Sequence, residues 1–219
     1  MQYITVTPEE FADLEGLEDW RFVLGSIHAH FRTGSFPAAA ALVSTIADAA
    51  ETAQHHPDID MRYPDHVRVT LKTHAARTLT THDVLLAREI SRLAAHRATS
   101  SEPVLCQGVE IAIDTIDERL IRPFWTAILG YRDDGVNLVD PLRIGPTFWF
   151  QLMQEPRVQR DRLHIDVSVP HDQAEGRIVA ALAAGGRLLS ADFARSWWIL
   201  ADADGNEACV CTWQDRAGK

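Results

Sequence analysis

Hydrophobic residues recur at two different spacings along the first half of the chain. From Leu42 to Ala53 they return every three or four positions, which predicts an amphipathic helix. Ser35 is placed to cap its N-terminus, and Pro37 suits its first turn, where a missing N–H costs little. We expect this helix to end before Pro57, because the residue preceding a proline avoids the helical region.

A strand and a second helix follow that proline. From Val67 to Leu71 every second residue is apolar, which predicts a half-buried strand. Apolar residues return to helical spacing over residues 81–95, and residues 20–31 alternate loosely, as a strand or hairpin does. The first half therefore mixes helices and strands in the manner of an α+β domain.

The second half contains an internal repeat. The segments GVEIAIDTIDERLIRPFWTAILGYR and RLHIDVSVPHDQAEGRIVAALAAGGRL each run from a strand through an acidic turn into a helix, and strand-like segments follow both. Duplication of this kind determines architecture, so we expect two βαβ-type modules joined into one sheet with a groove between them. Asp204 and Gly205 predict a hairpin turn, whereas a calcium loop would need glutamate where Trp213 stands.

Residues 96–103, between the halves, are small and polar and end in proline, as linkers do. We therefore place one domain at residues 1–97, a linker at 98–103 and a second domain at 104–219. Both domains fall in the usual size range.

Composition limits the partners and the location. The net charge of −10 argues against nucleic acid or an anionic membrane as the main partner. The sequence shows neither a run of about 18 apolar residues nor a signal-peptide pattern at its start. Its three cysteines make no disulfide framework. We expect a soluble, cytoplasmic protein.

Histidines are concentrated in the first half, where eight of the ten lie. Histidine titrates near neutral pH, so acid–base chemistry is expected there. His55 and His56 are adjacent at the end of the first helix, so they can serve one pocket in two roles, proton transfer and ligand binding. Glu51 lies one helical turn before His55, where a carboxylate would orient the imidazole and raise its pKa. His74 ends the predicted strand.

Simpler explanations compete with a catalytic one. A histidine pair can lie on a solvated surface, and a histidine at a helix C-terminus interacts favourably with the helix dipole. Asp83 fits the third helical position of a capping box that begins at Thr80.

An ordered set of residues connects these features. It comprises Glu51, the run His55-His56-Pro57, Tyr63, the alternating strand Val67, Val69, Leu71 with Thr73-His74, then Leu79-Thr80, Asp83 and Leu86-Ala87. This set, together with GLEDWR and HFRTGSFPAAAALV upstream, resembles the pterin-4a-carbinolamine dehydratase family over about residues 5–95.

The resemblance implies an antiparallel sheet with helices on one face. It also implies dehydration of 4a-hydroxytetrahydropterin to quinonoid dihydropterin, with no metal or organic cofactor. Loss of water requires an acid for the leaving hydroxyl and a base for a ring nitrogen. By position, His55 and His74 match the family's acid–base pair and His56 its substrate-binding histidine, while Glu51 and Asp83 match the supporting carboxylates.

Two positions depart from the family's pattern. Ile59 stands where the family often has tryptophan. Arg77 and Thr78 stand where it favours glycine before the Leu-Thr pair, and loss of glycine there is expected to alter the turn that carries His74.

The second half carries FW-x3-LGY at residues 124–131, RLHIDV at 162–167 and LADADGNEACV at 200–210. These segments make residues 104–214 resemble the glyoxalase/bleomycin-resistance, or vicinal oxygen chelate, superfamily, which implies paired βαβββ modules. Its metal enzymes take one ligand from each of four strands, and the matching positions here are Glu110, Gln151, His164 and Cys209. This set mixes hard and soft donors. We therefore expect no metal, with Cys209 buried as a small apolar residue.

Three functions are consistent with these observations. The leading one is pterin dehydration by histidine acid–base catalysis. The others are a protein that binds or sequesters a small molecule in the C-terminal groove, and a metal-dependent lyase or dioxygenase acting there. The expected partners are a pterin substrate, a second small ligand in that groove and further copies of the chain.

Overall fold

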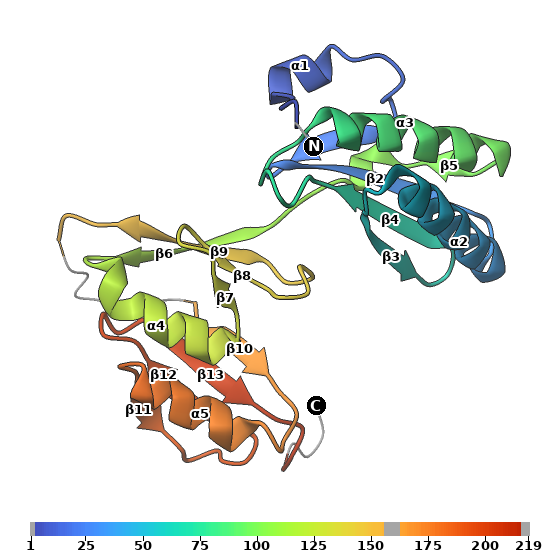
Figure 1. Ribbon diagram of the computed structural model, residues 1–219. Coiled ribbons are helices and arrows are strands. Elements are labelled where there is room, and N and C mark those ends of the chain that lie inside the picture. Colours follow the sequence, from blue (N-terminus) through green and yellow to red (C-terminus); the bar gives the residue numbers. More distant parts are fainter. Residues whose placement is uncertain (1–2, 156–162, 216–219) are drawn as a thin grey trace. The chain divides into compact units, whose positions relative to one another are not determined.

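A computed structural model describes residues 3–155 and 163–215 and divides the chain into two compact units, Met1–Gly108 and Val109–Lys219 (Figure 1). The predicted α+β class is confirmed, because helices and strands occur in both units. Among the residues described, every helix is too short or too polar to cross a membrane.

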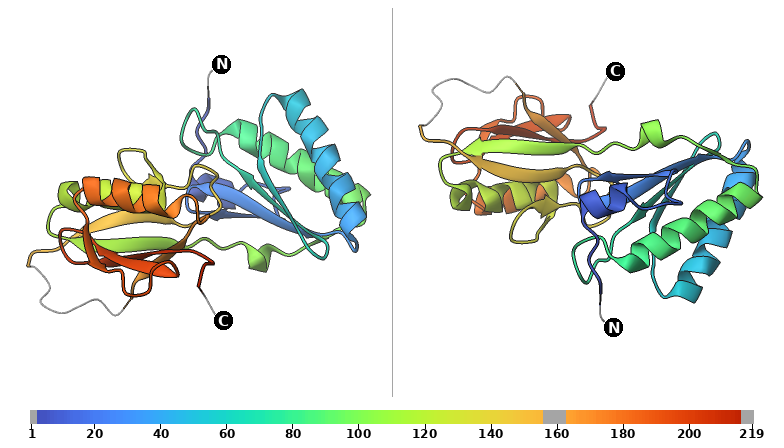
Figure 2. Two further views of the ribbon diagram at one scale, coloured as in Figure 1. Left: turned by 90° about the horizontal axis from the view of Figure 1, so that it is seen from below. Right: turned by 90° about the horizontal axis from the view of Figure 1, so that it is seen from above.

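The first unit is an antiparallel sheet covered by helices. In chain order its elements are α1 (Pro8–Ala12), β1 (Trp20–Val23), β2 (Ser26–Arg32), α2 (Phe36–Ala53), β3 (Asp58–Arg62), β4 (His66–Leu71), α3 (Thr81–His96), β5 (Ser100–Ser101) and the 3-10 helix η1 (Pro103–Leu105). The strand order is β1-β2-β4-β3, with β5 paired to the end of β2. Both long helices, α2 and α3, lie on one face of this sheet, as expected (Figure 2).

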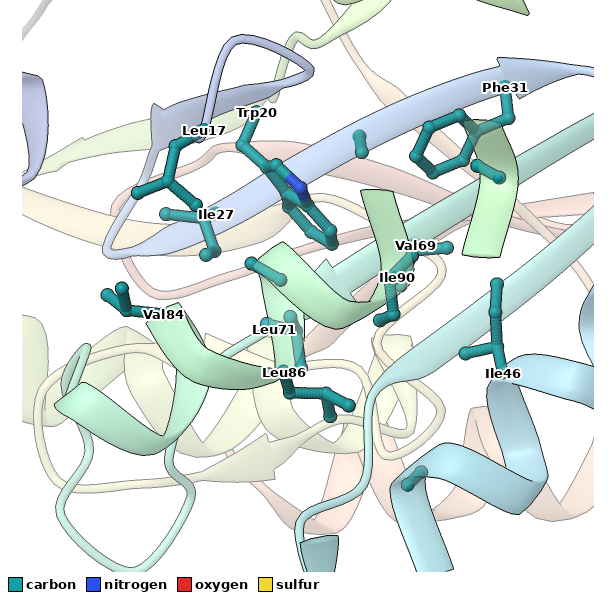
Figure 3. Packing of buried hydrophobic residues seen from close by; sticks show 14 of the residues in the cluster. Leu17, Trp20, Ile27, Phe31, Ile46, Val69, Leu71, Val84, Leu86 and Ile90 are labelled. Carbon is teal, nitrogen blue, oxygen red and sulfur yellow. The ribbon is translucent and has the colours of Figure 1, made fainter. Parts of the chain in front are cut away.

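Alternation along the strands builds the core of the first unit. Ile27, Ala29 and Phe31 on β2 are buried, as are Val67, Val69 and Leu71 on β4, while the residues that alternate with them are at least partly exposed. Figure 3 shows side chains of this face, such as Ile27 and Leu71, beside those of the helices, such as Leu86 and Ile90. Burial of this face is the main contribution to the stability of the unit.

The predicted ends of the helices are confirmed. The Ser35 side chain accepts a hydrogen bond from the backbone of the first turn of α2, and Pro37 lies in that turn. Thr80 caps α3 in a capping box with Asp83 at the third helical position. The hairpin expected over residues 20–31 is also present, as β1 and β2.

The segment expected to be a linker has structure of its own. Ser100 and Ser101 pair with Arg32 and Phe31 of β2, and the backbone N–H of Glu102 donates to the carbonyl of His30. The sulfur of Cys106 contacts the carbonyl of His28 at 3.3 Å. Residues 100–102 therefore extend the first sheet, because polar residues that look like a linker can still pair with the open edge of a strand.

The second unit consists of two modules with the same order of elements. The first contains β6 (Glu110–Thr115), α4 (Glu118–Leu129), β7 (Arg132–Asp133), β8 (Leu138–Val139) and β9 (Thr147–Leu152). The second contains β10 (Ile165–Ser168), α5 (Ala174–Ala183), β11 (Arg187–Ser190), β12 (Trp197–Ala201) and β13 (Glu207–Cys211). The predicted repeat is therefore present.

The modules do not share one hydrogen-bonded sheet, and this part of the prediction is wrong. Over the described residues they form two four-stranded sheets, ordered β6-β9-β8-β7 and β10-β13-β12-β11. Side chains rather than a backbone ladder join them, since one cluster of buried residues includes Ile121 and Phe124 from the first module and Leu200 and Val210 from the second.

One buried aspartate also connects the modules. The indole N–H of Trp125 on α4 donates to Asp202 Oδ2 at 2.8 Å, and Asp202 Oδ1 accepts the backbone N–H groups of Asp204 and Asn206. Asp202 thus organises the hairpin between β12 and β13, with Gly205 at φ +95°, and the predicted hairpin turn is confirmed. In the first module Asp140, after β8, likewise accepts backbone N–H groups from residues 142, 144 and 145.

Candidate active site

The first of the paired histidines contacts a buried carboxylate. Helix α2 ends at Ala53, and Gln54 follows in the left-handed region at φ +50°. The chain then places His55 Nε2 2.6 Å from Asp83 Oδ1 on α3. The His55 side chain is 11% exposed and that of Asp83 is fully buried. A carboxylate in contact with one ring nitrogen fixes the orientation and the tautomer of an imidazole.

Asp83 is held by three segments of the chain. Its Oδ2 accepts the backbone N–H of Thr80 at 2.7 Å and the hydroxyl of Thr73 at 2.8 Å, and its Oδ1 faces His55. These contacts compensate the burial of a charge, which would otherwise be costly. The capping box that competed with a catalytic role is therefore real, and Asp83 contacts the histidine as well.

Glu51 pairs with the second histidine rather than the first. Its Oε1 lies 3.0 Å from His56 Nε2, and the two side chains are 72% and 58% exposed. We expected Glu51 to orient His55, and that expectation is wrong. The left-handed residue Gln54 turns the chain away from the helical path, so helical spacing no longer governs which imidazole reaches Glu51.

His74 lies on a tight turn next to the Asp83 cluster. Thr73 and Thr78 form an antiparallel bridge across this turn, and the backbone N–H of Arg77 donates to the carbonyl of His74. His74 is exposed, and the residue before it bonds Asp83. Arg77 adopts φ +55°, a conformation that favours glycine. The turn is therefore left-handed at Arg77 even without the glycine that the family favours near that position.

A groove of about 550 Å³ opens beside His55 between α2 and α3. It is lined by apolar side chains such as Leu85 and Leu93, by the carboxylates of Asp48 and Glu89, and by two histidines. Of the five predicted site residues, only His55 lines it.

The second histidine in this groove is His82, which sequence reasoning did not select. Its ring centroid lies 6.0 Å from that of His55 and 5.5 Å from that of Tyr3. The sequence feature that could have identified His82 as a site residue was its position next to Asp83 in the first turn of the predicted helix. Ile59 packs against the core of the unit, so the residue that replaces the family's tryptophan has a structural role.

The four candidate metal positions of the second unit are not all brought together. Among the described residues, His164, Asp166 and Cys209 form the one group of three or more His, Cys, Asp or Glu side chains whose ligand atoms all lie within 4.8 Å of one another. Glu110, at the start of β6, is outside this group, and Gln151 is an exposed residue of β9.

Cys209 is buried, as the sequence predicted, and burial raises the pKa of its thiol to about 12, with a further increase from the neighbouring carboxylate of Asp166. A mixed nitrogen, oxygen and sulfur donor set suits a borderline ion such as Zn²⁺ better than Mg²⁺ or Ca²⁺. The residues therefore fit a metal ion in part, through two of the four positions that the superfamily uses and one that it does not.

The fold and the site together define an α+β protein with a histidine–carboxylate pair of the acid–base type, fused to a domain of two paired modules. Residues 5–93 match the family model for pterin 4 alpha carbinolamine dehydratase. A putative pterin-4-alpha-carbinolamine dehydratase of Nocardia farcinica is 49% identical over 81 residues, which are 37% of this chain and 84% of the relative. The chain belongs to the pterin 4 alpha carbinolamine dehydratase family.

The second half has its own relatives. Residues 110–211 match the family model described as a glyoxalase-like domain, so both predicted resemblances are confirmed. A glyoxalase-related enzyme from Fulvimarina pelagi is 18% identical, covering 49% of this chain and 88% of its own, with a TM-score of 0.40.

The solved structures similar to this chain also include a pterin dehydratase. This transcriptional coactivator/pterin dehydratase from Brucella melitensis is 29% identical, covering 41% of this chain and 98% of its own, with a TM-score of 0.38.

Proposed function

We propose that the first unit dehydrates 4a-hydroxytetrahydropterin to quinonoid dihydropterin by histidine acid–base catalysis. The observation that carries this proposal is the 2.6 Å contact between His55 and the buried Asp83, in a chain of this family. Asp83 also bonds Thr73, the residue before His74. One carboxylate thus joins the segments that carry both proposed catalytic histidines.

The reaction needs two proton transfers. The bond between C4a and the hydroxyl oxygen breaks as an acid protonates that oxygen, and a base removes a proton from a ring nitrogen, so that water leaves and a double bond forms. His55 Nε2 is engaged with Asp83, so Nδ1 is the atom of this ring that exchanges a proton with a ligand. His74 is assigned the complementary transfer, since a single group cannot be acid and base in the same step.

His56 and Glu51 are assigned to substrate binding. Both are solvent-accessible and their side chains are 3.0 Å apart at the end of α2. An exposed histidine–glutamate pair presents both a donor and an acceptor, which suits the amide and amino groups of a pterin ring. We expect His56→Ala to raise KM more than it lowers kcat.

The test is a stopped-flow assay with freshly generated 4a-hydroxytetrahydropterin. We expect the intact protein to accelerate dehydration, and His55→Ala and His74→Ala each to reduce the rate by roughly 10²- to 10⁴-fold. His96→Ala is the matched control, because His96 is an exposed histidine at the far end of α3. Full activity in both His55→Ala and His74→Ala would refute the assignment.

We also propose that the second unit binds a small ligand of its own. Trp149 and Gln151 on β9 are exposed on the face opposite to the buried Phe148 and Phe150. An aromatic surface beside a polar side chain is common in ligand sites. Hydrogen exchange in β9 should slow when the small-molecule fraction of a cell extract is added, and less so in Trp149→Ala. Equal exchange with and without that fraction would count against this site.

We also propose that the protein forms a homo-oligomer, so that its partners include further copies of the chain. The mass of one chain is 24.4 kDa, and light scattering should give a multiple of it because closed homo-oligomers are the commonest assemblies of soluble proteins. A measured mass equal to that of one chain would refute the proposed homo-oligomer.

A further inference from the structure

We propose that the second unit binds one divalent ion of the zinc class through His164, Asp166 and Cys209, all of which belong to its second module. The three side chains have ligand atoms within 4.8 Å of one another, and His164 Nε2 lies 3.4 Å from Asp166 Oδ1. The ligands of a tetrahedral zinc ion, each about 2.0–2.3 Å from the metal, lie at comparable distances from one another.

The backbone brings these residues together without help from the first module. Strands β10 and β13 run parallel, and Asp166 is the direct partner of Cys209 in their register. His164 is two positions before Asp166, and side chains two apart in an extended chain share a face. A one-residue shift in the register of these strands would separate the three donors.

Asp166 distinguishes this site from the one that the superfamily resemblance implied. That arrangement takes one ligand from each of four strands, here Glu110, Gln151, His164 and Cys209. Glu110 does not belong to the described cluster, and Asp166 does. The proposed site therefore uses two strands of one module, and the carboxylate comes from β10 instead of β6.

The site is open to solvent on one side and closed on the other. The side chains of His164 and Asp166 are 54% and 58% exposed, whereas Cys209 is 6% exposed. An ion can therefore enter from solvent and meet the sulfur at the base of the site. On binding, the thiol proton passes to solvent as the metal–sulfur bond forms. Three protein donors leave a fourth position for water or a ligand, as in catalytic zinc sites.

The test is a titration of the full-length protein, first freed of metal with a chelator, using Co²⁺ as a coloured substitute for Zn²⁺. We expect saturation at one ion per chain with the near-ultraviolet band of a cobalt–thiolate bond. The band should disappear in Cys209→Ser. Affinity for Zn²⁺, measured by competition, should fall by at least about 10-fold in Asp166→Asn and in His164→Ala. Asp166 and His164 are exposed, so the Asp166→Asn and His164→Ala variants should fold normally.

Matched controls separate the two arrangements of ligands. Cys211→Ser changes the other cysteine of β13 and should keep the band, and Glu110→Gln should keep the affinity. Loss of affinity in Glu110→Gln together with normal affinity in Asp166→Asn would overturn the two-strand site in favour of the four-strand one. A titration with no saturable thiolate band would overturn the proposal altogether. The readout is optical and independent of pterin dehydration.

Discussion

Asp83 is the residue on which the first unit depends for both helix initiation and the orientation of His55. Its two carboxylate oxygens contact the backbone of Thr80, the hydroxyl of Thr73 and the imidazole of His55. A neutral amide at this position has one acceptor oxygen instead of two, so it cannot satisfy all these groups.

We therefore expect Asp83→Asn to reduce the dehydration rate by roughly 10²-fold or more. The free energy of unfolding should fall by about 1–3 kcal/mol, because a buried group loses its partner. Stopped-flow kinetics and urea unfolding measure the two effects. Asp13→Asn, which changes an exposed carboxylate of the same unit, should leave both quantities unchanged. A stable, fully active Asp83→Asn protein would contradict the role assigned to this carboxylate.

Arg77 gives a second prediction at this scale. Its φ of +55° costs a residue with a side chain roughly 1 kcal/mol or more relative to glycine. Arg77→Gly should therefore raise the free energy of unfolding by about 1 kcal/mol and keep the turn that carries His74. Ala76→Gly is the control, because Ala76 does not have a positive φ and glycine there only adds freedom to the unfolded chain. Equal effects of the two changes would show that the left-handed conformation is not strained.

Individual residues also show where sequence reasoning succeeded and where it stopped. The spacing predicted that Asp83 would complete a capping box, and the family resemblance made it a supporting carboxylate; in the structure it caps α3 and contacts His55. The pairing of Glu51 with His56 was missed because one left-handed residue, Gln54, overrides helical spacing. His82 was missed because its proximity to His55 depends on how α2 and α3 pack.

Strand β2 carries two histidines on the face opposite to the core. The imidazole of His28 donates from Nε2 to the carbonyl of Val23 at 3.3 Å, and its Nδ1 lies 3.1 Å from the hydroxyl of Thr70. Burial lowers the pKa of His28, and the charges of Arg68 and His30 lower it further, against the opposing effect of the Val23 carbonyl. Burial also lowers the pKa of His30, and the charge of Arg68 lowers it further.

A histidine with a lowered pKa makes stability depend on pH. Below the ordinary histidine pKa of 6.5 the unfolded chain binds more protons than the folded one, so stability is retained above that pH and lost as the pH falls. We expect the free energy of unfolding to decrease from about pH 8 to about pH 5, and the decrease to be smaller in His28→Gln. His96→Gln should leave the slope unchanged. An identical slope in His28→Gln would show that this ring titrates normally.

Long elements were predictable and short ones were not. Helices α2 and α3 and strand β4 each extend over enough residues for their periodicity to be recognised. Strand β5 has two residues, both serine, and forms only because the end of β2 offers an unpaired edge. Nothing in its own composition indicates a strand, since the partner supplies the reason for the pairing.

At the scale of the whole molecule, each unit has its own cluster of buried residues. Trp20 and Phe31 belong to the first cluster and Phe124 to the second. We expect Phe124→Ala to destabilise the second unit by about 3–5 kcal/mol. Hydrogen exchange followed by mass spectrometry should show faster exchange in peptides of α4 and β13, and unchanged exchange in peptides of α2 and β4. Faster exchange throughout the chain would mean that the units unfold together.

The repeat was predictable from sequence, whereas the way in which its copies join was not. Similar order along the chain indicated two modules, and the structure contains both, each with the same order of elements. Hydrogen bonding between the modules would require an edge strand of one sheet to pair with an edge strand of the other. Residues on two separate strands determine together whether such pairing forms, so the pattern of one segment does not predict it. The structure joins the modules through buried side chains such as Ile121 and Leu200.

The hydrogen bond between Trp125 and Asp202 means that the two copies are no longer interchangeable. Asp140 occupies the corresponding loop of the first module and bonds only backbone N–H groups among its described contacts, and helix α5 contains no tryptophan. In a chain assembled from two copies of the second module, Asp202 Oδ2 would keep the side-chain amide of Asn206 as a donor and lose the indole N–H of Trp125. The repeat is therefore asymmetric at this contact, because the helix of the first module donates to the hairpin of the second and no equivalent bond among the described residues runs the other way.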